Sequence, residues 1–311
     1  MSPIAPENNK PRRGKFILIL FILIVLNVLT FCLFFFYPYI RQAYIMREVN
    51  SSNLDVDYST ERWFSEYEML DQAISYFFQF EKVTEITIDG EGVTVTPQDI
   101  NKISKISELS SLGKVYIHNM TITDQLIDVL LNCKKLDVLM LNNIVITDHQ
   151  LRQLGTISSL KSLDLVNSTK IPEQAFIEFL EANPQLQFII LGNTSLATDQ
   201  IASAISKLPQ LKMIVFCEES LTDKHIEIIS SSRSIAGIAI NKHIHFEIIS
   251  SSKSIEVISI NDFPHISDDS FQYLKRMPSL DWLCLDGTST TPAGLIEFKN
   301  ARPKCEIYRS R

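Results

Sequence analysis

Apolar residues divide the chain into two unlike parts. The first part is an uninterrupted run from Phe16 to Tyr37, FILILFILIVLNVLTFCLFFFY, which contains no charged side chain. As a helix this run rises about 33 Å, because each residue adds about 1.5 Å, and the hydrocarbon core of a bilayer is about 30 Å thick. The pattern predicts one transmembrane helix over residues 16–37, preceded by a short tail, residues 1–15.

Two cleaved forms of this segment are the alternatives to a permanent anchor. A secretory signal has an apolar region of about 7–15 residues and a cleavage site with small residues, and neither is present here. A lipoprotein signal needs a small residue before the cysteine, but Phe31 precedes Cys32. We therefore expect an uncleaved signal-anchor and a single-pass protein.

The charge distribution predicts the orientation of this anchor. Residues 1–40 contain four basic residues and one acidic residue, whereas the remainder contains 25 basic and 35 acidic residues, so the net charges are +3 and −10. A short basic flank stays in the cytoplasm. We expect localisation in the cell membrane, with a cytoplasmic N-terminus and an acidic extracytoplasmic domain. An acidic domain also argues against nucleic-acid binding, which needs a basic face.

After the anchor, apolar residues recur in the pattern L-x-x-L-x-L. Unit starts from Leu112 onward are spaced 24, 24, 26, 25, 24, 20 and 25 residues apart, and a partial unit begins 25 residues later at Cys305. A period of this length is the signature of a solenoid. The apolar triplets are Val83/Ile86/Ile88, Leu112/Val115/Ile117, Leu136/Leu139/Leu141, Leu160/Leu163/Leu165, Leu186/Ile189/Leu191, Leu211/Ile214/Phe216, Ile235/Ile238/Ile240, Ile255/Ile258/Ile260 and Leu280/Leu283/Leu285.

The pattern resembles the leucine-rich repeat family over residues 83–307, in about nine units. Its ITD-x-x-L turns look most like the short repeats of membrane-anchored bacterial proteins and of cysteine-containing repeats. The resemblance implies an α/β solenoid with a parallel sheet on the concave side and short helices on the convex side. One column departs from the family pattern, because the usual asparagine is replaced by Ile144, Ser168, Thr194 and Thr288.

Two further columns predict how each unit turns. One column holds residues that tolerate positive φ and so turn the chain off the sheet. The next column holds Thr-Asp or equivalent pairs. The hydroxyl caps the N-terminus of a helix, and the negative charge of the aspartate is stabilised by the helix dipole. The turn column is Asn119, Asn143, Asn167, Asn193, Asp262 and Gly287. The helix starts are Thr123-Asp124, Thr147-Asp148, Thr198-Asp199, Thr222-Asp223, Ser267-Asp268 and Thr291-Pro292.

The array has one irregular unit and two ends. HIEIISSSRSI at 225–235 recurs as HFEIISSSKSI at 245–255, which indicates a duplication with a tighter or poorly formed convex segment. Residues 38–60 are expected to be a juxtamembrane linker. Residues 61–82 carry aromatic residues at helical spacing and predict a capping helix over the first repeat, with a second membrane-surface helix as the alternative. Residues 308–311 are expected to leave the fold.

Residue types used in catalysis or metal binding do not occur together at the spacing of a known kind of site. His243-x-His245 has a spacing that suits a metal, but no Cys, Asp or Glu ligand accompanies it. The serine runs at 230–232 and 250–252 are interpreted as solvated loops, and there is no glycine-rich phosphate loop. We therefore expect no enzyme activity, catalytic residue, metal, cofactor or small-molecule substrate.

Cysteines and glycosylation sequons leave alternatives open. The four cysteines after the anchor permit three pairings, among which a Cys284–Cys305 bridge would join consecutive units. Sequons occur at Asn50, Asn119, Asn167 and Asn193. Three of the four coincide with the turn column, so we favour a backbone role for these asparagines over glycosylation.

The outward residues of the strands are free of core packing. Large apolar residues recur among them, and a contiguous exposed apolar patch usually marks a partner site. The alternative is that such residues merely suit a strand surface. Phe188, Met213 and Trp282 are the strongest candidates, because they are too large for strand preference alone. The full candidate set is Tyr116, Val138, Met140, Phe188, Ile190, Met213, Val215, Val257 and Trp282.

These observations predict a membrane-tethered leucine-rich repeat domain that binds a protein partner through its concave sheet. The alternative is a structural cell-envelope or surface protein that self-associates or binds polysaccharide. A scaffold for an unrecognised enzyme is less favoured, because every segment longer than a linker is assigned to anchor, cap or repeat.

Overall fold

The computed structural model describes residues 26, 37–62, 81–217, 221–240, 246–260 and 263–309. The chain divides into two compact units, Met1–Arg47 with Glu61–Lys82, and Glu48–Thr60 with Val83–Arg311. We call the second unit the repeat domain. The predicted span over 16–37 lies outside the described residues except for Leu26 and Tyr37. Among the residues described, no helix combines the length and the apolar character needed to cross a bilayer.

Eleven strands form one sheet in which spatial order follows chain order. Each pair from β2·β3 to β10·β11 is parallel. This topology requires one crossover per unit, as a solenoid does. The strands are β1 Asp55–Arg62, β2 Glu81–Asp89, β3 Lys114–Thr121, β4 Val138–Val145, β5 Ser162–Val166, β6 Phe188–Gly192, β7 Met213–Cys217, β8 Gly237–Ile240, β9 Val257–Ile260, β10 Trp282–Cys284 and β11 Glu306–Tyr308.

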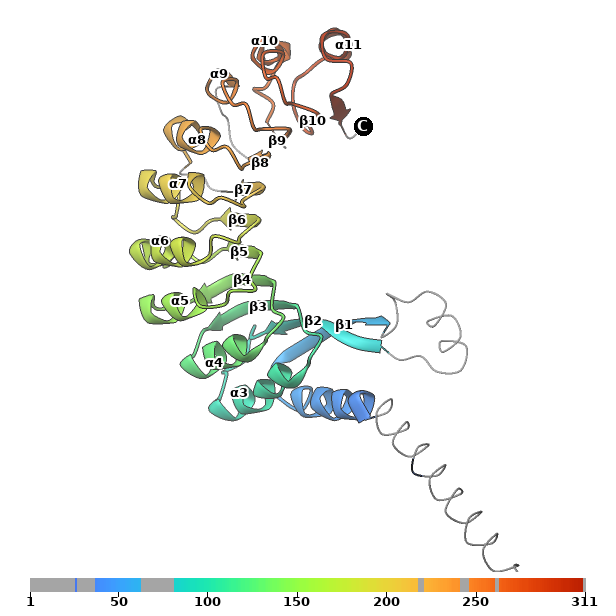
Figure 1. Ribbon diagram of the computed structural model, residues 1–311, viewed down its shortest axis with the longest axis vertical. Coiled ribbons are helices and arrows are strands. Elements are labelled where there is room, and N and C mark those ends of the chain that lie inside the picture. Colours follow the sequence, from blue (N-terminus) through green and yellow to red (C-terminus); the bar gives the residue numbers. More distant parts are fainter. Residues whose placement is uncertain are drawn as a thin grey trace, which may run out of the picture. The chain divides into compact units, whose positions relative to one another are not determined.

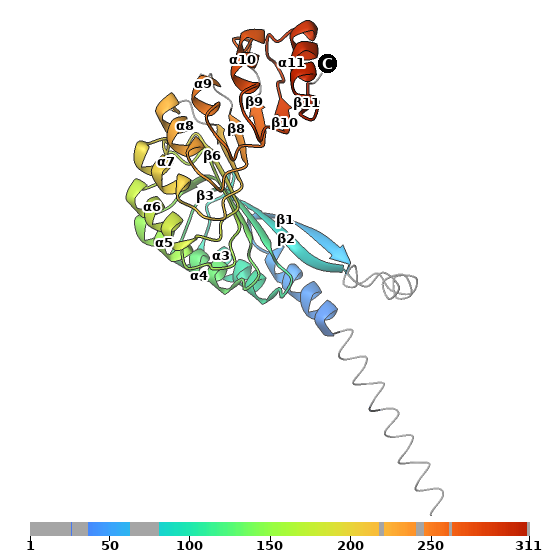
Figure 2. The same ribbon diagram turned by 45° about the horizontal axis from the view of Figure 1, so that its top comes forward.

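The crossovers contain short helices. In the repeat domain the helices follow the outer side of an arc and the strands follow its inner side (Figures 1 and 2). This arrangement confirms the leucine-rich repeat solenoid, with the sheet on the concave side. The α-helices are α3 Pro97–Ile103, α4 Asp124–Asn132, α5 Asp148–Leu154, α6 Glu173–Ala182, α7 Asp199–Ser206, α8 Asp223–Ser230, α9 Phe246–Ile249, α10 Phe271–Leu274 and α11 Pro292–Ala301. The 3-10 helices are η1 Ser104–Glu108 and η2 Asp268–Ser270.

The predicted apolar triplets form the core. Leu139, Leu163 and Ile189 are at most 1% exposed, and they lie opposite one another on β4, β5 and β6. Burying one such side chain stabilises the fold by about 1.5–3 kcal/mol relative to leaving it in water. Because each side chain packs on the unit before and the unit after it, this stabilisation depends on stacking.

The turn column has the predicted backbone conformation. Asn119, Asn143, Asn167 and Asn193 have φ between 51° and 55°. Their amides also bond from unit to unit: Asn143 Nδ2 donates to Asn119 Oδ1 at 2.7 Å, and Asn193 Nδ2 donates to Asn167 Oδ1 at 3.3 Å. The turn role of these asparagines is confirmed, whereas their glycosylation stays untested. Gly287 continues the column with φ 64°, and Asp262 lies outside the described residues.

Three of the four residues in the column from which the family asparagine is missing carry hydroxyl groups, namely Ser168, Thr194 and Thr288. Ser168 Oγ accepts from the Ile144 amide at 3.1 Å and donates to the Val166 carbonyl at 3.0 Å. Thr288 Oγ1 donates to the Leu285 carbonyl at 2.8 Å. Both side chains are buried. A buried hydroxyl can satisfy a backbone donor and an acceptor at once, so the departure from the family pattern leaves these backbone groups paired.

Helix capping follows the predicted column in five of its six positions. The side chains of Thr123, Thr147, Thr198, Thr222 and Thr291 accept from the backbone of the third helical residue.

The sixth predicted helix start is wrong. Ser267 precedes the 3-10 helix η2 and makes no side-chain cap bond. The neighbouring Asp268 carboxylate instead accepts from the amide and hydroxyl of Thr291, at 2.8 and 2.6 Å. A β-carbon at Gly294 would collide with this carboxylate. Asp268 therefore links two units, which explains why glycine stands at 294.

Residues 38–60, which the sequence analysis assigns to a juxtamembrane linker, contain regular secondary structure. Residues 37–49 are helical and β1 begins at Asp55. Asp99 Oδ1 accepts from the Asn53 amide at 2.9 Å, and Lys102 Nζ donates to the Ser51 carbonyl at 2.6 Å. The β1 sequence, DVDYSTER, is mostly polar and gives no apolar signal, although its backbone pairs with β2.

Both flanks of the predicted capping helix, residues 61–82, are strand rather than helix, since β1 ends at Arg62 and β2 begins at Glu81. Its centre, residues 63–80, lies outside the described residues. The prediction that residues 308–311 leave the fold is also wrong in part. Tyr308 belongs to β11, and Arg309 Nη2 donates to the Thr288 carbonyl at 3.2 Å.

The serine runs are more buried than predicted. Ser232 and Ser252 are 7% and 3% exposed, so the interpretation of 230–232 and 250–252 as solvated loops holds only for the exposed Ser231 and Ser251. Ser254 Oγ donates to the Ser232 carbonyl at 2.8 Å, and so ties one unit to the unit before it. The duplicated unit has the short helix that was expected, since α9 contains four residues.

We expect Thr147→Ala to lower the free energy of unfolding by about 1 kcal/mol, because it removes a capping hydroxyl. Ser267→Ala is the matched control. It is expected to change stability by less than about 0.5 kcal/mol, because that hydroxyl makes no cap bond. Urea denaturation of the full-length chain measures both values. An equal loss in the two variants would contradict the assigned capping roles.

Candidate partner-binding face

Strand register groups the outward residues into three columns. Column A is the set of residues in register with Val138, column B the set in register with Met140, and column C the set in register with Asn142. Column A contains Glu85, Lys114, Val138, Ser162, Phe188, Met213, Gly237, Val257, Trp282 and Glu306. Column B contains Thr87, Tyr116, Met140, Asp164, Ile190, Val215, Ala239, Ser259, Cys284 and Tyr308. Column C contains Asp89, His118, Asn142, Val166, Gly192 and Cys217.

All nine candidate residues lie in columns A and B, on the concave side of the sheet. They fall into two regions. Tyr116, Val138 and Met140 lie on β3 and β4, whereas the other six lie between β6 and β10. Phe188 is the most exposed of the nine, at 46%. Their common placement on one face follows from the register, but their binding role stays a prediction.

The part of the face from β6 to β10 is apolar, and we call it the apolar half. In columns A and B it presents Phe188, Ile190, Met213, Val215, Gly237, Ala239, Val257, Ser259, Trp282 and Cys284. Neighbouring strands are about 4.8 Å apart, so Phe188 on β6 and Trp282 on β10, four strands apart in the sheet, are separated by about 19 Å across it.

Met213 lies over its neighbour rather than pointing away from the sheet. A β-carbon at Gly237 would collide with the Met213 sulfur atom, and Gly237 is buried. The thioether therefore occupies the space that a side chain on β8 would fill. Sequence reasoning treated the two positions separately, although the glycine makes room for the methionine.

The part of the face from β2 to β5 is polar, and we call it the polar half. Lys114 Nζ and Glu85 Oε2 form an ion pair at 3.3 Å in column A. Asp89 accepts from Asn119 Nδ2 at 3.0 Å, and this hydrogen bond lowers the pKa of the Asp89 carboxyl. Partial burial raises the pKa of the Tyr116 phenol, and the negative charge of Glu85 adds to this effect.

Asp164 lies where the two halves meet, and the sequence analysis did not single it out. It stands in column B between Met140 and Ile190 and is only 8% exposed. Its Oδ1 atom is buried and has no hydrogen-bond partner among the described residues. Burial raises the pKa of the Asp164 carboxyl from 3.8 to about 6. The available signal was a lone acidic residue in a mostly apolar outward column.

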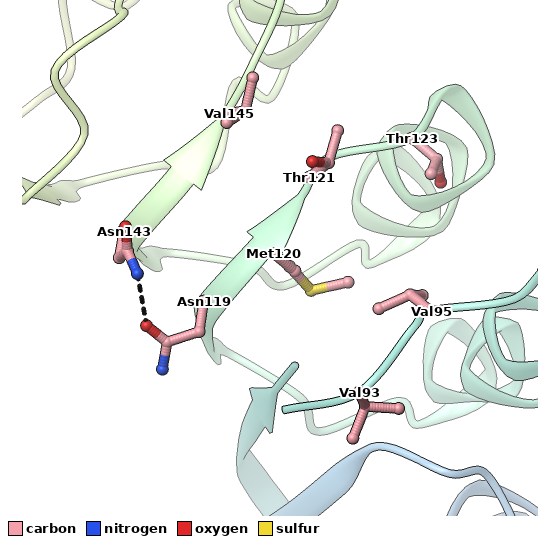
Figure 3. Close-up of a pocket in the computed structure, with 8 residues that line it drawn as sticks. All are labelled: Val93, Val95, Asn119, Met120, Thr121, Thr123, Asn143 and Val145. Atoms are coloured by element: carbon pink, nitrogen blue, oxygen red, sulfur yellow. Dashed lines mark hydrogen bonds between the residues drawn. The ribbon is translucent and has the colours of Figure 1, made fainter. Parts of the chain in front are cut away.

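A pocket of about 430 Å³ lies at the ends of β3 and β4 (Figure 3). Of the eight described residues that line it, none carries an ionisable side chain. The Asn119 and Asn143 amides at its edge already bond to each other at 2.7 Å, as the dashed line in Figure 3 shows. Thr123 caps α4. The side chains of Asn119, Asn143 and Thr123 therefore have structural partners.

Other sites considered from the sequence are not assembled in the described part of the chain. Within it, no group of three or more His, Cys, Asp or Glu side chains is placed to hold a metal ion; His243 and His245 lie outside it. Cys284 and Cys305 are not joined in a disulfide. Burial raises the pKa of the Cys133 thiol to about 12, so this thiol is unreactive at neutral pH.

We expect Asp164→Asn to stabilise the chain at neutral pH. The folded-state pKa lies above the unfolded value, so the folded state binds the extra proton between about pH 4 and pH 6, and stability decreases as pH rises through that window. The variant removes this penalty, which is at most about 3 kcal/mol because one pKa unit corresponds to about 1.4 kcal/mol.

Denaturant midpoints of the full-length chain at pH 7.5 and pH 4 test this expectation. The gain from Asp164→Asn should appear at pH 7.5 and vanish near pH 4. Glu306→Gln, an exposed change in column A, is the control for the loss of one negative charge and should stay within about 0.5 kcal/mol at both values. A variant that is destabilised at pH 7.5 would show that the carboxylate has a stabilising partner within the fold.

Comparisons with known proteins yield similarity at the level of fold. No protein-family model and no curated protein matches the chain. Internalin C2 from Listeria monocytogenes is similar at 17% identity and a TM-score of 0.43, over 71% of this chain and 89% of that chain. Internalin F from the same organism is similar at 13% identity and a TM-score of 0.35, over 78% and 89%.

A third solved structure, the TLR13–ssRNA13 complex, is similar at 15% identity and a TM-score of 0.48. That match covers 68% of this chain but only 30% of the TLR13 chain. The leucine-rich repeat assignment therefore rests on the repeat period and strand register of this chain itself.

Proposed function

We propose that this chain is a membrane-tethered leucine-rich repeat protein whose concave face binds a protein partner non-covalently. The observation that carries this proposal is the row of large apolar side chains on the apolar half, of which Phe188 is 46% exposed and the others are half-buried. Aromatic residues and methionine are enriched at the centres of protein interfaces. The solenoid core does not require them there, because the inward triplets already fill it.

The size of the apolar half indicates how far a partner must reach. It extends about 19 Å across the strands and about 7 Å from column A to column B, since two residues of a strand rise about 7 Å. The resulting area is about 130 Å². A stable interface buries about 800 Å² on each partner, so a partner seated on the apolar half must also cover other parts of the face.

The net charge of −10 after residue 40 supports a protein partner over a nucleic acid. The proposed tether is the apolar run 16–37, and the basic residues before it support a cytoplasmic N-terminus. The repeat domain would then lie on the extracytoplasmic side of the cell membrane. No catalytic role forms part of this proposal.

We expect a photoreactive residue in the apolar half to capture the partner in intact cells. Replacing Phe188 or Trp282 by p-benzoylphenylalanine should give several-fold more cross-linked product than the same replacement at Ile296. Ile296 is the control because it is 64% exposed but lies on the outer helix α11. Mass spectrometry of the products identifies the partner.

The products also separate the two candidate functions. Adducts with another protein at 188 and 282, but not at 296, are the expected result. Adducts with a second copy of this chain would instead support a structural surface protein that self-associates. Equal yields at all three positions would refute a binding role for the concave face.

We expect the chain to stay in the membrane fraction after alkaline carbonate washing, and deletion of residues 1–37 to release it. Orientation follows from Cys217, which is the exposed cysteine among the four described, whereas Cys133, Cys284 and Cys305 are buried. A membrane-impermeant maleimide added to intact cells should label the protein, and Cys217→Ser should lose the label. Labelling only after lysis would contradict the proposed orientation.

A further inference from the structure

We propose that Asp164 binds a basic side chain of the partner, a lysine or an arginine that is followed within a few residues by apolar side chains. This inference rests on the proposed function and names the chemistry that the concave face recognises. It starts from the one described ionisable group on that face that is both buried and left with an unpartnered oxygen atom.

The Asp164 carboxylate has no cation around it on the sheet. Its outward neighbours on β4, β5 and β6 are uncharged: Val138, Met140, Asn142, Ser162, Val166, Phe188, Ile190 and Gly192. Lys161, which precedes β5, instead lies 4.0 Å from Asp137, at the start of the strands. A charged group in such surroundings is costly unless a hydrogen-bonding partner of opposite charge reaches it.

The missing partner is better supplied by another molecule than by this chain. Asp164 lies in column B of the concave face, and the side chains of its two register neighbours, Met140 and Ile190, cannot donate hydrogen bonds. A single carboxylate is also too few ligands for a metal ion, which takes four or more. A lysine or arginine satisfies both the charge and the hydrogen bond.

The position of Asp164 also predicts what flanks the basic residue. Phe188 and Ile190 lie on the adjacent strand, about 5 Å away across the sheet, and the apolar half continues from them to Trp282. A partner segment that crosses the strands would therefore place its basic residue at Asp164 and its apolar residues over β6 and β7. The interface area argument agrees, since a partner must extend beyond the apolar half.

A random 12-residue peptide library displayed on phage, selected on the full-length chain in detergent, supplies the probe. Enriched peptides should contain a lysine or arginine next to aromatic or aliphatic residues. Each is then synthesised with its basic residue and with norleucine in its place, which keeps the aliphatic stem and removes the charge. Affinities are measured on the unchanged chain, on Asp164→Asn and on Glu306→Gln.

We expect Asp164→Asn to weaken binding of the basic peptide at least about tenfold, as loss of a charge-assisted hydrogen bond does. The affinity for the norleucine peptide should not change. Glu306→Gln removes an acidic group from column A and should change either affinity less than about twofold. Binding of the basic peptide should also weaken as pH falls below about 6, where Asp164 becomes protonated, and this pH dependence should be absent in Asp164→Asn.

The outcomes separate this inference from the proposed function. Two results would overturn the inference and leave the concave face as the binding site. In the first, the peptides lose binding to the Phe188→Ser, Trp282→Ser double variant but contain no basic residue. In the second, Asp164→Asn weakens the binding of the basic peptide and of its norleucine form equally. Selected peptides that are insensitive to the double variant, or a selection that enriches none, would count against the proposed function itself.

Discussion

The parallel pairing of one strand per unit, in an unbroken register from β2 to β11, is the constraint on which the rest of the repeat domain depends. Because side chains alternate along a strand, a shift by one residue in any unit would move its apolar residues from the core to the solvent. Leu139, Leu163 and Ile189 therefore stack in line, and the residues between them are equally aligned on the opposite face. The concave face is thus a product of core packing.

Polar side chains then satisfy the backbone where each unit leaves the sheet. The asparagine turns let the chain reverse direction without strain, and their amides connect one unit to the next. Ser168 and Thr288 satisfy buried backbone groups at the position where related repeats use asparagine. The two columns solve one problem together, because a backbone that leaves a sheet beside a core must still find hydrogen-bond partners.

Features that could be predicted from the sequence are determined within one repeat unit, whereas the features that were missed give no signal within one unit. The inward triplets, the asparagine turns and the threonine caps depend on residues within one unit, so each could be assigned from spacing and residue type. β1 was missed because its residues are mostly polar and form no apolar pattern in the sequence. Asp164 was missed because its lack of a partner depends on what three neighbouring units present. The cap predicted at Ser267 was wrong because a 3-10 helix follows this residue and its side chain makes no cap bond.

The last strand has a consequence for how copies of this chain behave at high concentration. A solenoid ends in an unpaired strand edge, and long flat edges of this kind template end-to-end polymerisation and aggregation. β11 is only three residues long and carries the exposed Glu306, and Arg309 turns back to the Thr288 carbonyl. A short charged edge offers few backbone groups for a second copy to extend, which disfavours end-to-end pairing of copies at β11.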